Sequence, residues 1–508
     1  MSSIQAFDWI AKHATAQPDA PALNDLLSGR RYTYRDMHER LDRCALFLHR
    51  HCGVGPGDRV ALLMHNSSDV VEVLFACWRL GAICVPMNWR LAVPEIVYIL
   101  GDCQPKALVH TAEFAENAAA AAAQLQGEVA LVGVDDGRPS PYESGLNAAA
   151  GSLPAVEHGF DDPWVLLYTS GTTGRPKGAQ ITYGMQLFNA VNCAVATGIT
   201  NRSHGLCVLP LFHVGGVCVY LSPILHAGGN NTIMHEFDAE KMLGLMTDRS
   251  ADAMTHCLGV PTNFLFISQL PAFREAKLDH LQSVGVGGAA PSTALLETYA
   301  KKGVLFEHAW GMTETSSIGT IIPKHRALEK IGSCGLPALH VDCKIADEDG
   351  NDLPPGAVGE LLIRGPTVTS GYWQMPEATA QAFLPGGWFR TGDAARVDED
   401  GYYYIVDRWK DMYISGGENV YPLEVEDALY RLNGVAECAV VGVPDPRWGE
   451  VGRAFIVQEA GAGLTEDRVI AHCRENLAHY KAPKSVRFID ELPHNATGKI
   501  TKHLLPRE

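Results

Sequence analysis

The stretch YTSGTTGRPKG at residues 168–178 combines three glycines with four serine or threonine residues around one proline, one arginine and one lysine. Glycine and β-branched hydroxyl residues weaken helical propensity, and proline blocks a helix interior. The apolar run Trp164 to Tyr168 just before it is typical of a strand. The stretch is therefore predicted to be a loop at a strand end, where backbone N–H groups, hydroxyls and a cation can hold phosphate oxygens.

This loop is not a Walker loop, because Lys177 is followed by Gly178 and not by serine or threonine. Taken alone, it is also compatible with a flexible surface turn. The phosphate interpretation depends on motifs further along the chain. They are GMTET at 311–315 preceded by Trp310, TGD at 391–393, DRWKD at 407–411, SGGEN at 415–419 and NATGKI at 495–500.

The bulk composition limits the class of protein. A chain of 508 residues exceeds what a single core usually supports, so two or more domains are expected. The net charge of −17 argues against nucleic acid or an anionic membrane surface as a partner. No signal peptide and no apolar run long enough for a membrane span is evident, and thirteen scattered cysteines fit reduced thiols. We therefore expect a cytoplasmic protein.

The first half of the chain alternates between helix and strand patterns. A helix is predicted from the capping residue Thr33 to a stop at 53–57, followed by a strand from Val60 to Met64. A helix from Asp69 to Leu80 and a strand from Ala82 to Pro86 come next. This alternation predicts a parallel α/β sheet.

After about residue 335 the pattern changes to short strands separated by turns such as Asp349-Gly350, which predicts a small antiparallel β unit. From Pro422 onward, helix, strand, strand and helix follow one another. We predict an N-terminal domain over residues 1–409 and a small, mobile α+β domain over residues 410–508, joined near the DRWKD motif.

Taken together, the motifs resemble the adenylate-forming superfamily of acyl-CoA synthetases, luciferases and peptide-synthetase adenylation domains, over nearly the whole chain. The resemblance implies a large domain of two stacked α/β sheets with a small β-barrel, followed by a mobile lid domain. It also implies an AMP-forming acid–CoA ligase that uses ATP, Mg²⁺ and CoA. The alternatives are loading of a carrier-protein phosphopantetheine and a non-catalytic adenylate-binding relative.

The resemblance also implies roles for single residues. Lys499 matches the cation that bridges the substrate carboxylate and the α-phosphate, and Glu314 with Thr169 matches the magnesium ligands. Asp393 and Arg408 match the ribose contacts, although a salt bridge at a turn would also suit either of them. Trp310 matches a flat face for adenine. The remaining nucleotide contacts are expected at Ser170, Gly171, Thr172, Thr173, Gly174, Lys177, Gly288, Ala289, Ala290, Gly311, Met312 and Thr313.

Further matches concern the thiol half of the reaction. Lys410 falls at the family's hinge, where a few residues absorb the rotation between two working arrangements of the domains. Residues that resemble CoA contacts are Gly416, Gly417, Trp448, Tyr480 and Lys484, for which plain packing is an equal alternative.

The segment PLFHVGG at 210–216 places His213 where acyl-CoA synthetases have a histidine at the mouth of the acid pocket, although a lone histidine is more often structural. Amino-acid-activating relatives carry an aspartate there, so an acid without an α-amino group is expected. Gly215, Gly216, Gly285 and Gly287 either leave room for an alkyl or aryl body or permit close packing. The sequence favours a fatty acid or an aryl acid of the hydroxycinnamate type, and it is compatible with a homodimer without indicating one.

Overall fold

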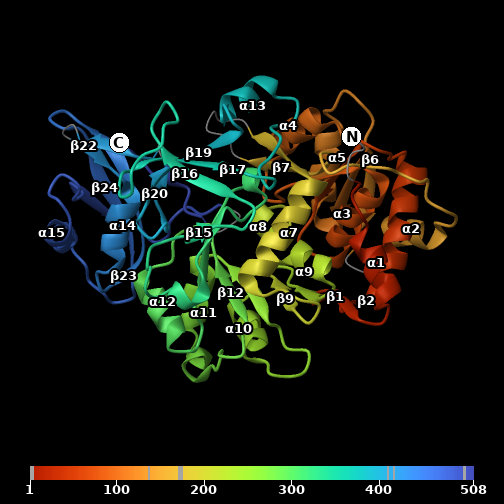
Figure 1. The fold of residues 1–508 in the computed structure, drawn as a ribbon, viewed down its shortest axis with the longest axis horizontal. Helices are drawn as coiled ribbons and strands as arrows, with labels where there is room; N and C mark the ends of the chain where they lie inside the picture. The colour runs from red at the N-terminus through yellow and green to blue at the C-terminus, as the bar shows by residue number, and fades with distance from the viewer. Residues whose placement is uncertain are drawn as a thin grey trace.

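The computed structural model describes residues 5–135, 138–169, 176–408, 411–415, 418–495 and 499–507. The N-terminal elements, in red to yellow, lie at one end of the molecule, and the C-terminal elements, in blue, lie at the other (Figure 1). Four sheets account for the described strands.

The first sheet has six strands in the order β6-β5-β3-β4-β7-β8, and all neighbours are parallel except β7 and β8. Its central strands are continuous apolar runs because helices cover both faces. The predicted strands at residues 60–64, 82–86 and 164–168 are confirmed here. The strands are β3 (Arg59–Leu63), β4 (Ile83–Pro86), β5 (Ala107–Thr111), β6 (Ala130–Val134), β7 (Pro163–Thr169) and β8 (Lys177–Thr182).

The second sheet has nine strands in the order β15-β14-β13-β12-β11-β9-β10-β1-β2, parallel from β13 to β1 and antiparallel at both edges. Its strands are β1 (Pro21–Asp25), β2 (Arg31–Thr33), β9 (His204–Cys207), β10 (Asn230–Ile233), β11 (His256–Gly259), β12 (Ser283–Val286), β13 (Glu307–Trp310), β14 (Thr320–Ile321) and β15 (Leu336–Pro337). Together the two sheets confirm the two stacked α/β sheets.

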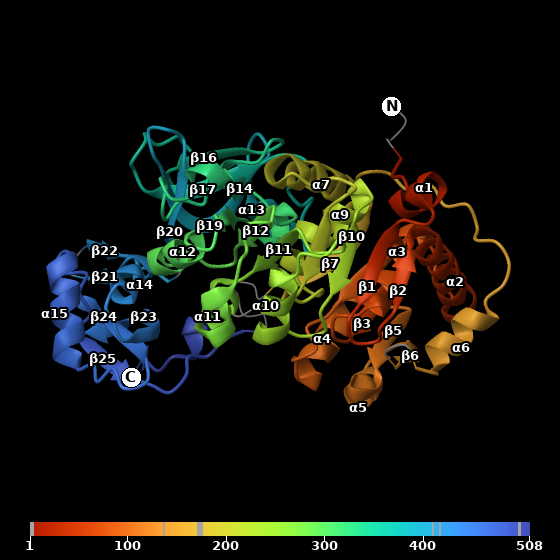
Figure 2. The same ribbon diagram turned by 90° about the horizontal axis from the view of Figure 1, so that it is seen from below.

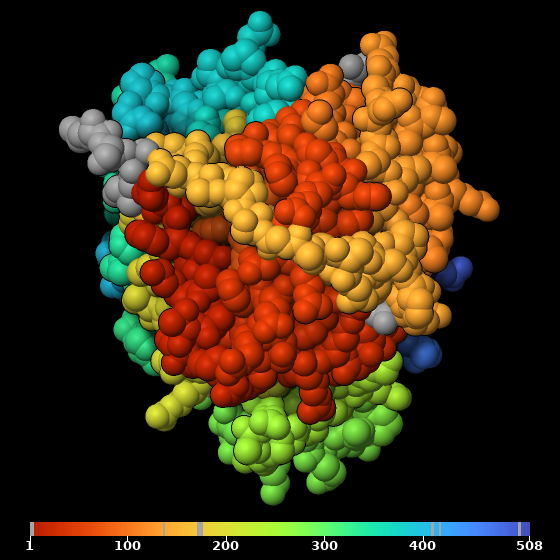
Figure 3. Space-filling model, turned by 90° about the vertical axis from the view of Figure 1, so that its right-hand side faces the viewer, coloured from red at the N-terminus to blue at the C-terminus, as the bar shows by residue number. Residues whose placement is uncertain are grey.

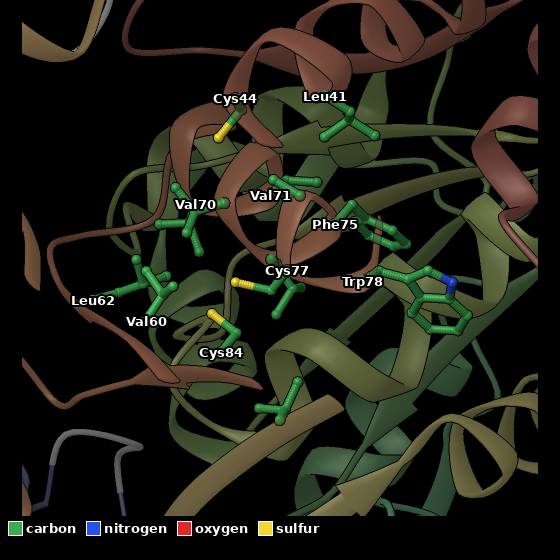
Figure 4. Close-up of a cluster of buried hydrophobic side chains, with 14 of the residues drawn as sticks. Leu41, Cys44, Val60, Leu62, Val70, Val71, Phe75, Cys77, Trp78 and Cys84 are labelled. Atoms are coloured by element: carbon green, nitrogen blue, oxygen red, sulfur yellow. The ribbon is translucent and has the colours of Figure 1, made fainter. Parts of the chain in front are cut away.

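One hydrophobic core joins the two sheets, with helix α3 (Ser68–Leu80) inside it. Leu41 and Cys44 of α2 (Tyr34–Cys52) lie on one side of α3, and Leu62 of β3 and Cys84 of β4 lie on the other (Figure 4). A helix with apolar residues all round is stable only when it is covered on every side. Figure 2 shows α3 beside α2, at the N-terminal end of the molecule in red.

Helix α2 begins and ends where the sequence predicts. Thr33 and Asp36 form a capping box at its N-terminus, and Gly53 takes the left-handed conformation, with φ of 67°, at its C-terminus. The connection 149–162, in yellow-orange, crosses the face formed by the N-terminal elements in red (Figure 3).

The other described helices of the large domain surround the sheets or connect their strands. The α-helices are α1 (Trp9–Ala16), α4 (Val93–Cys103), α5 (Ala115–Ala122), α6 (Pro141–Ala148), α7 (Tyr183–Thr197), α8 (Val214–Gly216), α9 (Ser222–Ala227), α10 (Ala239–Thr247), α11 (Pro261–Gln269), α12 (Thr293–Ala300) and α13 (Pro376–Ala382). Tighter or wider turns form η1 (Ala112–Phe114), η2 (Val217–Leu221), η3 (Pro271–Glu275), η4 (Thr313–Thr315) and η5 (Lys324–Arg326).

The third sheet is the antiparallel unit that the turn pattern predicts. It runs β16-β17-β19-β18, with β20 paired to β19. The strands are β16 (Asp342–Ala346), β17 (Gly359–Arg364), β18 (Phe383–Leu384), β19 (Trp388–Val397) and β20 (Tyr403–Arg408).

The C-terminal unit contains the fourth sheet, in the order β22-β21-β24-β23 with β25 paired to β24, and two helices. Helix α15 begins after the capping residue Thr465, as the sequence predicts. The elements are β21 (Tyr413–Ser415), β22 (Glu418–Val420), α14 (Pro422–Tyr430), β23 (Val435–Asp445), β24 (Gly449–Gln458), α15 (Glu466–Asn476), β25 (Ser485–Phe488) and η6 (Lys502–Leu504).

Within the described ranges, no helix combines the length and the apolar character needed to cross a membrane. All thirteen cysteines are free thiols, as the scattered spacing predicts.

Candidate active site

The predicted site residues gather at the carboxyl ends of parallel strands. Thr169 ends β7, residues 287–290 follow β12, and residues 311–315 follow β13. Ligands of open α/β sheets bind at this edge, because the loops there are free to vary while the strands hold them in place.

Lys499 reaches this edge from the C-terminal unit. Its backbone N–H donates to the Asn495 side chain at 2.9 Å, and its carbonyl accepts from the Asn495 N–H at 2.8 Å, so the backbone of Lys499 is held against Asn495. Its Cε lies 3.2 Å from the point where a Cβ on Gly288 would stand. Gly288 has a φ of +80°, so a side chain there would be strained as well as crowded. The lysine stem therefore lies directly on the strand-end loop.

His213 lies close to the same ammonium group. Its Nδ1 accepts from the Gly215 N–H at 3.1 Å, and the residue forms the N-cap of α8. Burial, with the charge of Lys499 as the second cause, lowers the pKa of His213 to about 4. The imidazole is therefore neutral at pH 7 and adds no charge beside Lys499.

Glu314 is held by a tyrosine that the sequence motifs do not include. The Tyr372 hydroxyl donates to Glu314 Oε1 at 2.9 Å, and Lys177 Nζ lies 5.0 Å from the centre of the Tyr372 ring. Burial, followed by the charge of Glu314, raises the pKa of Tyr372. The Tyr372 hydroxyl therefore stays protonated and donates its hydrogen bond. Because Thr169 pairs with Lys177 across β7 and β8, these residues share one corner of the site.

This corner offers the oxygen ligands that Mg²⁺ prefers. Glu314 provides a buried carboxylate, and Thr169 provides a half-buried hydroxyl at a strand end. The donor set fits a magnesium ion that keeps waters and phosphate oxygens as its other ligands. Mg²⁺ neutralises phosphate charge when it is bound there.

The GMTET turn requires its glycine. A Cβ on Gly311 would stand 1.3 Å from the carbonyl oxygen of Ser317, so no other residue fits without moving the chain. Met312 and Thr313 follow it, and Thr315 Oγ1 accepts from the Met312 N–H at 3.0 Å. Ser316 and Ser317 both have positive φ, of 55° and 95°, and such conformations are found mainly where the surrounding structure holds them in place.

Trp310 and Asp393 form one unit. The indole N–H of Trp310 donates to Asp393 Oδ2 at 2.9 Å, and both residues are buried. Asp393 also pairs with Arg408 along β19 and β20, so the predicted ribose contacts are neighbours in one sheet. Stacking of adenine on Trp310 stays a prediction.

The four glycines of the acid pocket divide into two pairs. A Cβ on Gly216 would stand 2.2 Å from the Pro210 carbonyl oxygen, and one on Gly285 would stand 2.9 Å from the Leu258 side chain. These two permit close packing. On Gly215 and Gly287 the nearest atoms would be 3.3 and 3.4 Å away, so these two positions are less crowded, but a Cβ there would still make a tight contact.

Next to Gly215 lies a cavity of about 10 Å³, room for about one water molecule. Tyr220 of η2 and Leu258 of β11 help to close it. The Tyr220 hydroxyl is 2.6 Å from Ser283 Oγ, which in turn donates to the buried Glu307. Sequence patterns gave no sign of this network, since its members come from three separate elements.

The predicted CoA residues are partly exposed aromatic rings with cations beside them. Trp448 is 39% exposed, with the Lys484 Nζ 5.8 Å from its ring centre, and Tyr480 is 38% exposed. Ser415 pairs with Gly449, so the end of β21 lies beside Trp448. Ala289 and Ala290 are exposed after β12. Predicted residues that lie outside the described ranges are Ser170, Gly171, Thr172, Thr173, Gly174, Lys410, Gly416 and Gly417, together with the side chain of Arg408.

Comparison with known proteins identifies the family. The AMP-binding enzyme family matches residues 10–373, and the AMP-binding enzyme C-terminal domain matches residues 424–499. The chain belongs to the AMP-binding enzyme family. It is an AMP-forming ligase of the acyl-CoA synthetase class, which uses ATP with Mg²⁺ and takes CoA as a co-substrate.

Two curated relatives of this AMP-binding enzyme act on different acids. Feruloyl-CoA synthase of Amycolatopsis sp is 42% identical over 494 residues, which cover 97% of this chain and 97% of that protein. Long-chain-fatty-acid–CoA ligase FadD13 of Mycobacterium tuberculosis is 37% identical over 501 residues, which cover 98% of this chain and 97% of that protein. Both names specify transfer to CoA, which favours the CoA interpretation over the carrier-protein alternative.

A solved relative distinguishes two arrangements of the enzyme. ATP-bound MatB from Rhodopseudomonas palustris is 31% identical and has a TM-score of 0.90, over 98% of this chain and 97% of that chain. Apo MatB, at the same identity and coverage, has a TM-score of 0.79. The arrangement of this AMP-binding enzyme is therefore closer to the ATP-bound one, which agrees with the position of Lys499 on Gly288.

Proposed function

We propose that this AMP-binding enzyme activates an aryl acid of the hydroxycinnamate type and transfers it to CoA. In the first step Lys499 screens the substrate carboxylate and the α-phosphate from each other, because two anions must meet there. Glu314 and Thr169 hold the metal, and Asp393, oriented by Trp310, holds the ribose. The acid body extends past His213 toward Gly215 and Gly287.

The observation that carries the choice of acid is the closed end of the pocket. Beyond Gly215, Tyr220 and Leu258 border a cavity of only about 10 Å³. Tyr220 is 3% exposed and its hydroxyl is fixed by Ser283, so it is not free to swing aside without losing a buried hydrogen bond. A compact planar ring fits such an end better than an extended alkyl chain does.

The chemistry of the lining agrees with an acid that has no amino group. None of the residues that border the cavity is acidic, and His213 is neutral at pH 7 because burial lowers its pKa to about 4. The higher identity to the feruloyl-CoA synthase than to the long-chain-fatty-acid–CoA ligase, 42% against 37%, points the same way.

The test is a panel of acids from acetate to palmitate, with benzoates and cinnamates, scored for CoA-dependent AMP release. Ferulate or p-coumarate should give a kcat/KM at least about a hundredfold above that of palmitate, the discrimination that a closed pocket supplies. Tyr220→Leu should raise kcat/KM for the longer aliphatic acids by about tenfold. Tyr220→Phe keeps the ring but loses the bond to Ser283, so it should relax the length limit less than Tyr220→Leu does.

Palmitate as the best substrate of the unaltered enzyme would refute the proposal. So would a Tyr220→Leu enzyme with the same chain-length profile as the Tyr220→Phe enzyme.

We further propose that the domain boundary lies at residues 409 and 410 and that Lys410 is the hinge. After adenylation, rotation there brings the face with Trp448, Tyr480, Lys484, Gly416 and Gly417 to the site, where the CoA thiol displaces AMP. The free thiols support a reducing compartment, and we propose the cytoplasm.

A further inference from the structure

A second cluster of polar side chains lies outside the site described above. His65 follows β3, Glu113 follows β5, and His235 follows β10, so the cluster sits where the carboxyl ends of the two large sheets meet. The ligand atoms of these three residues lie within 4.8 Å of one another. Glu236, the next residue along, brings a second carboxylate to the group.

His65 is the buried member of this cluster. Its side chain is 6% exposed, and its Nδ1 has no hydrogen-bond partner. Its Nε2 is 3.5 Å from Glu113 Oε1, and its Nδ1 is 3.9 Å from Glu236 Oε1. A buried nitrogen without a hydrogen bond costs free energy, so it indicates a group that binding would satisfy.

His235 is held in the orientation typical of a metal ligand. Its Nδ1 lies 3.3 Å from the carbonyl oxygen of Asn66, to which it donates, so the lone pair falls on Nε2. That Nε2 is 4.0 Å from Glu236 Oε1. Metal-binding histidines usually donate their other ring N–H to a carbonyl or carboxylate in this way, which fixes the tautomer and the ring.

We propose that His65, His235 and Glu113 form a binding site for a divalent transition-metal ion of the zinc type, with Glu236 as a fourth ligand. Two imidazoles with carboxylates suit zinc, whereas magnesium prefers oxygen ligands alone. Glu113 and Glu236 are about half exposed, at 49% and 59%, so an ion can enter from solvent while His65 holds it from inside.

Binding requires a small local rearrangement. The His65 and His235 rings stack with their centres 4.5 Å apart. Zinc bonds of about 2.0 to 2.2 Å bring tetrahedral ligand atoms to about 3.3 Å from one another. The two rings must therefore turn until their lone pairs converge, against the Trp89 ring whose centre lies 3.9 Å from that of His65.

The charges nearby leave room for a cation. Arg90 stacks on Trp89 at 4.0 Å, and its single charge is more than balanced by Glu113 and Glu236.

The cluster connects to the acid pocket through Asn66. The Asn66 side chain accepts from the Leu211 N–H at 2.8 Å and donates to the Leu209 carbonyl at 3.0 Å. These residues precede His213 in the same loop. An ion bound to His65 therefore makes the turn at His65 and Asn66 more rigid. Through the Asn66 side chain, it also steadies the loop that carries His213.

The test uses the full chain, stripped with EDTA and titrated with ZnCl₂ against a chromophoric chelator in millimolar Mg²⁺. We expect one zinc ion per chain with a submicromolar Kd, and X-ray absorption with nitrogen and oxygen neighbours only. His65→Gln and Glu113→Gln should each weaken binding by about a hundredfold or more. His325→Gln, which alters an exposed histidine of η5, should bind as the unaltered chain does.

Three outcomes would overturn the proposal. They are equal affinity in the variants and the unaltered chain, sulfur neighbours in the absorption spectrum, and no zinc binding tighter than about 10 μM. If the thermal transition shows that His65→Gln does not fold, the exposed Glu113→Gln decides, because its side chain supports no core packing. None of these outcomes depends on the acid that the enzyme activates.

Discussion

Replacing Trp310 with phenylalanine tests the proposed nucleotide site most directly. The change keeps an aromatic ring and removes the N–H that lies 2.9 Å from Asp393 Oδ2. A hydrogen bond to a charged group contributes about 1.5 to 3 kcal/mol, and the smaller ring adds a cavity term of about 1 kcal/mol. Since Trp310 and Asp393 are only 8% and 3% exposed, water does not replace the lost donor. We therefore expect a loss of about 2.5 to 4 kcal/mol in the free energy of unfolding.

The same change should weaken ATP binding, because Asp393 is no longer held toward the ribose. If the full free energy of this hydrogen bond is lost from ATP binding, the KM for ATP in acid-dependent pyrophosphate exchange rises by about ten- to a hundredfold. Trp388→Phe is a matched control in the same sheet as Asp393. Its half-buried ring lies against Lys344 and Arg364, 4.9 and 4.6 Å from its centre, and it should leave the KM unchanged.

Two results would refute this reasoning. If Trp310→Phe unfolds with the same free energy as the unaltered enzyme, the indole N–H does not support the buried carboxylate. If stability falls but the KM for ATP stays within twofold of that of Trp388→Phe, Asp393 does not contact the nucleotide.

Three further predictions concern other parts of the molecule. Lys499→Ala should lower pyrophosphate exchange by about a hundredfold or more but leave CoA transfer from a supplied acyl-adenylate within a few-fold, as quenched-flow assays of each half-reaction would show. Glu314→Gln should raise the Mg²⁺ concentration for half-maximal adenylation by about tenfold or more, and an unchanged magnesium titration would remove it from the site. Burial lowers the pKa of the fully buried His256 to about 4, so the unfolded chain binds more protons between about pH 6.5 and 4. The free energy of unfolding should therefore fall as the pH drops through that window, by about 3 kcal/mol from this residue, and denaturant titrations should show a shallower fall in His256→Gln.

The parts of the fold that the sequence predicts best have local causes. Helix α2 is set by the Thr33 capping box and by Gly53, and both signals lie within a turn of the residues that they affect. The strands β9, β11 and β12 have only four residues each, too few for a period to separate strand from helix. Their pairing depends on neighbours tens of residues away, so the order of the second sheet did not follow from local patterns.

The site residues also fall into two groups, those that a short sequence motif predicts and those that only the tertiary structure brings together. Glu314 and Gly311 belong to a short motif whose spacing is visible in the sequence, and the Gly311 turn shows why that glycine is needed. Tyr372 lies 58 positions from Glu314 and has no motif of its own, so its hydrogen bond arises only from tertiary structure. Likewise, Gly216 and Gly285 resemble pocket glycines in sequence, yet their neighbours show that they serve packing.

The arrangement of the two units bears on how one enzyme performs two half-reactions. Lys499 lies on Gly288, so the rotation that we propose for the thiol step requires this contact to break. The Asp407 carboxylate accepts from the Leu423 N–H at 2.9 Å, and these residues stand on opposite sides of the proposed hinge at Lys410. Rotation about the hinge works against that bond, whose net contribution of about 1.5 to 3 kcal/mol is small enough for CoA binding to offset. The bond would thus favour the adenylation arrangement until a thiol substrate is present.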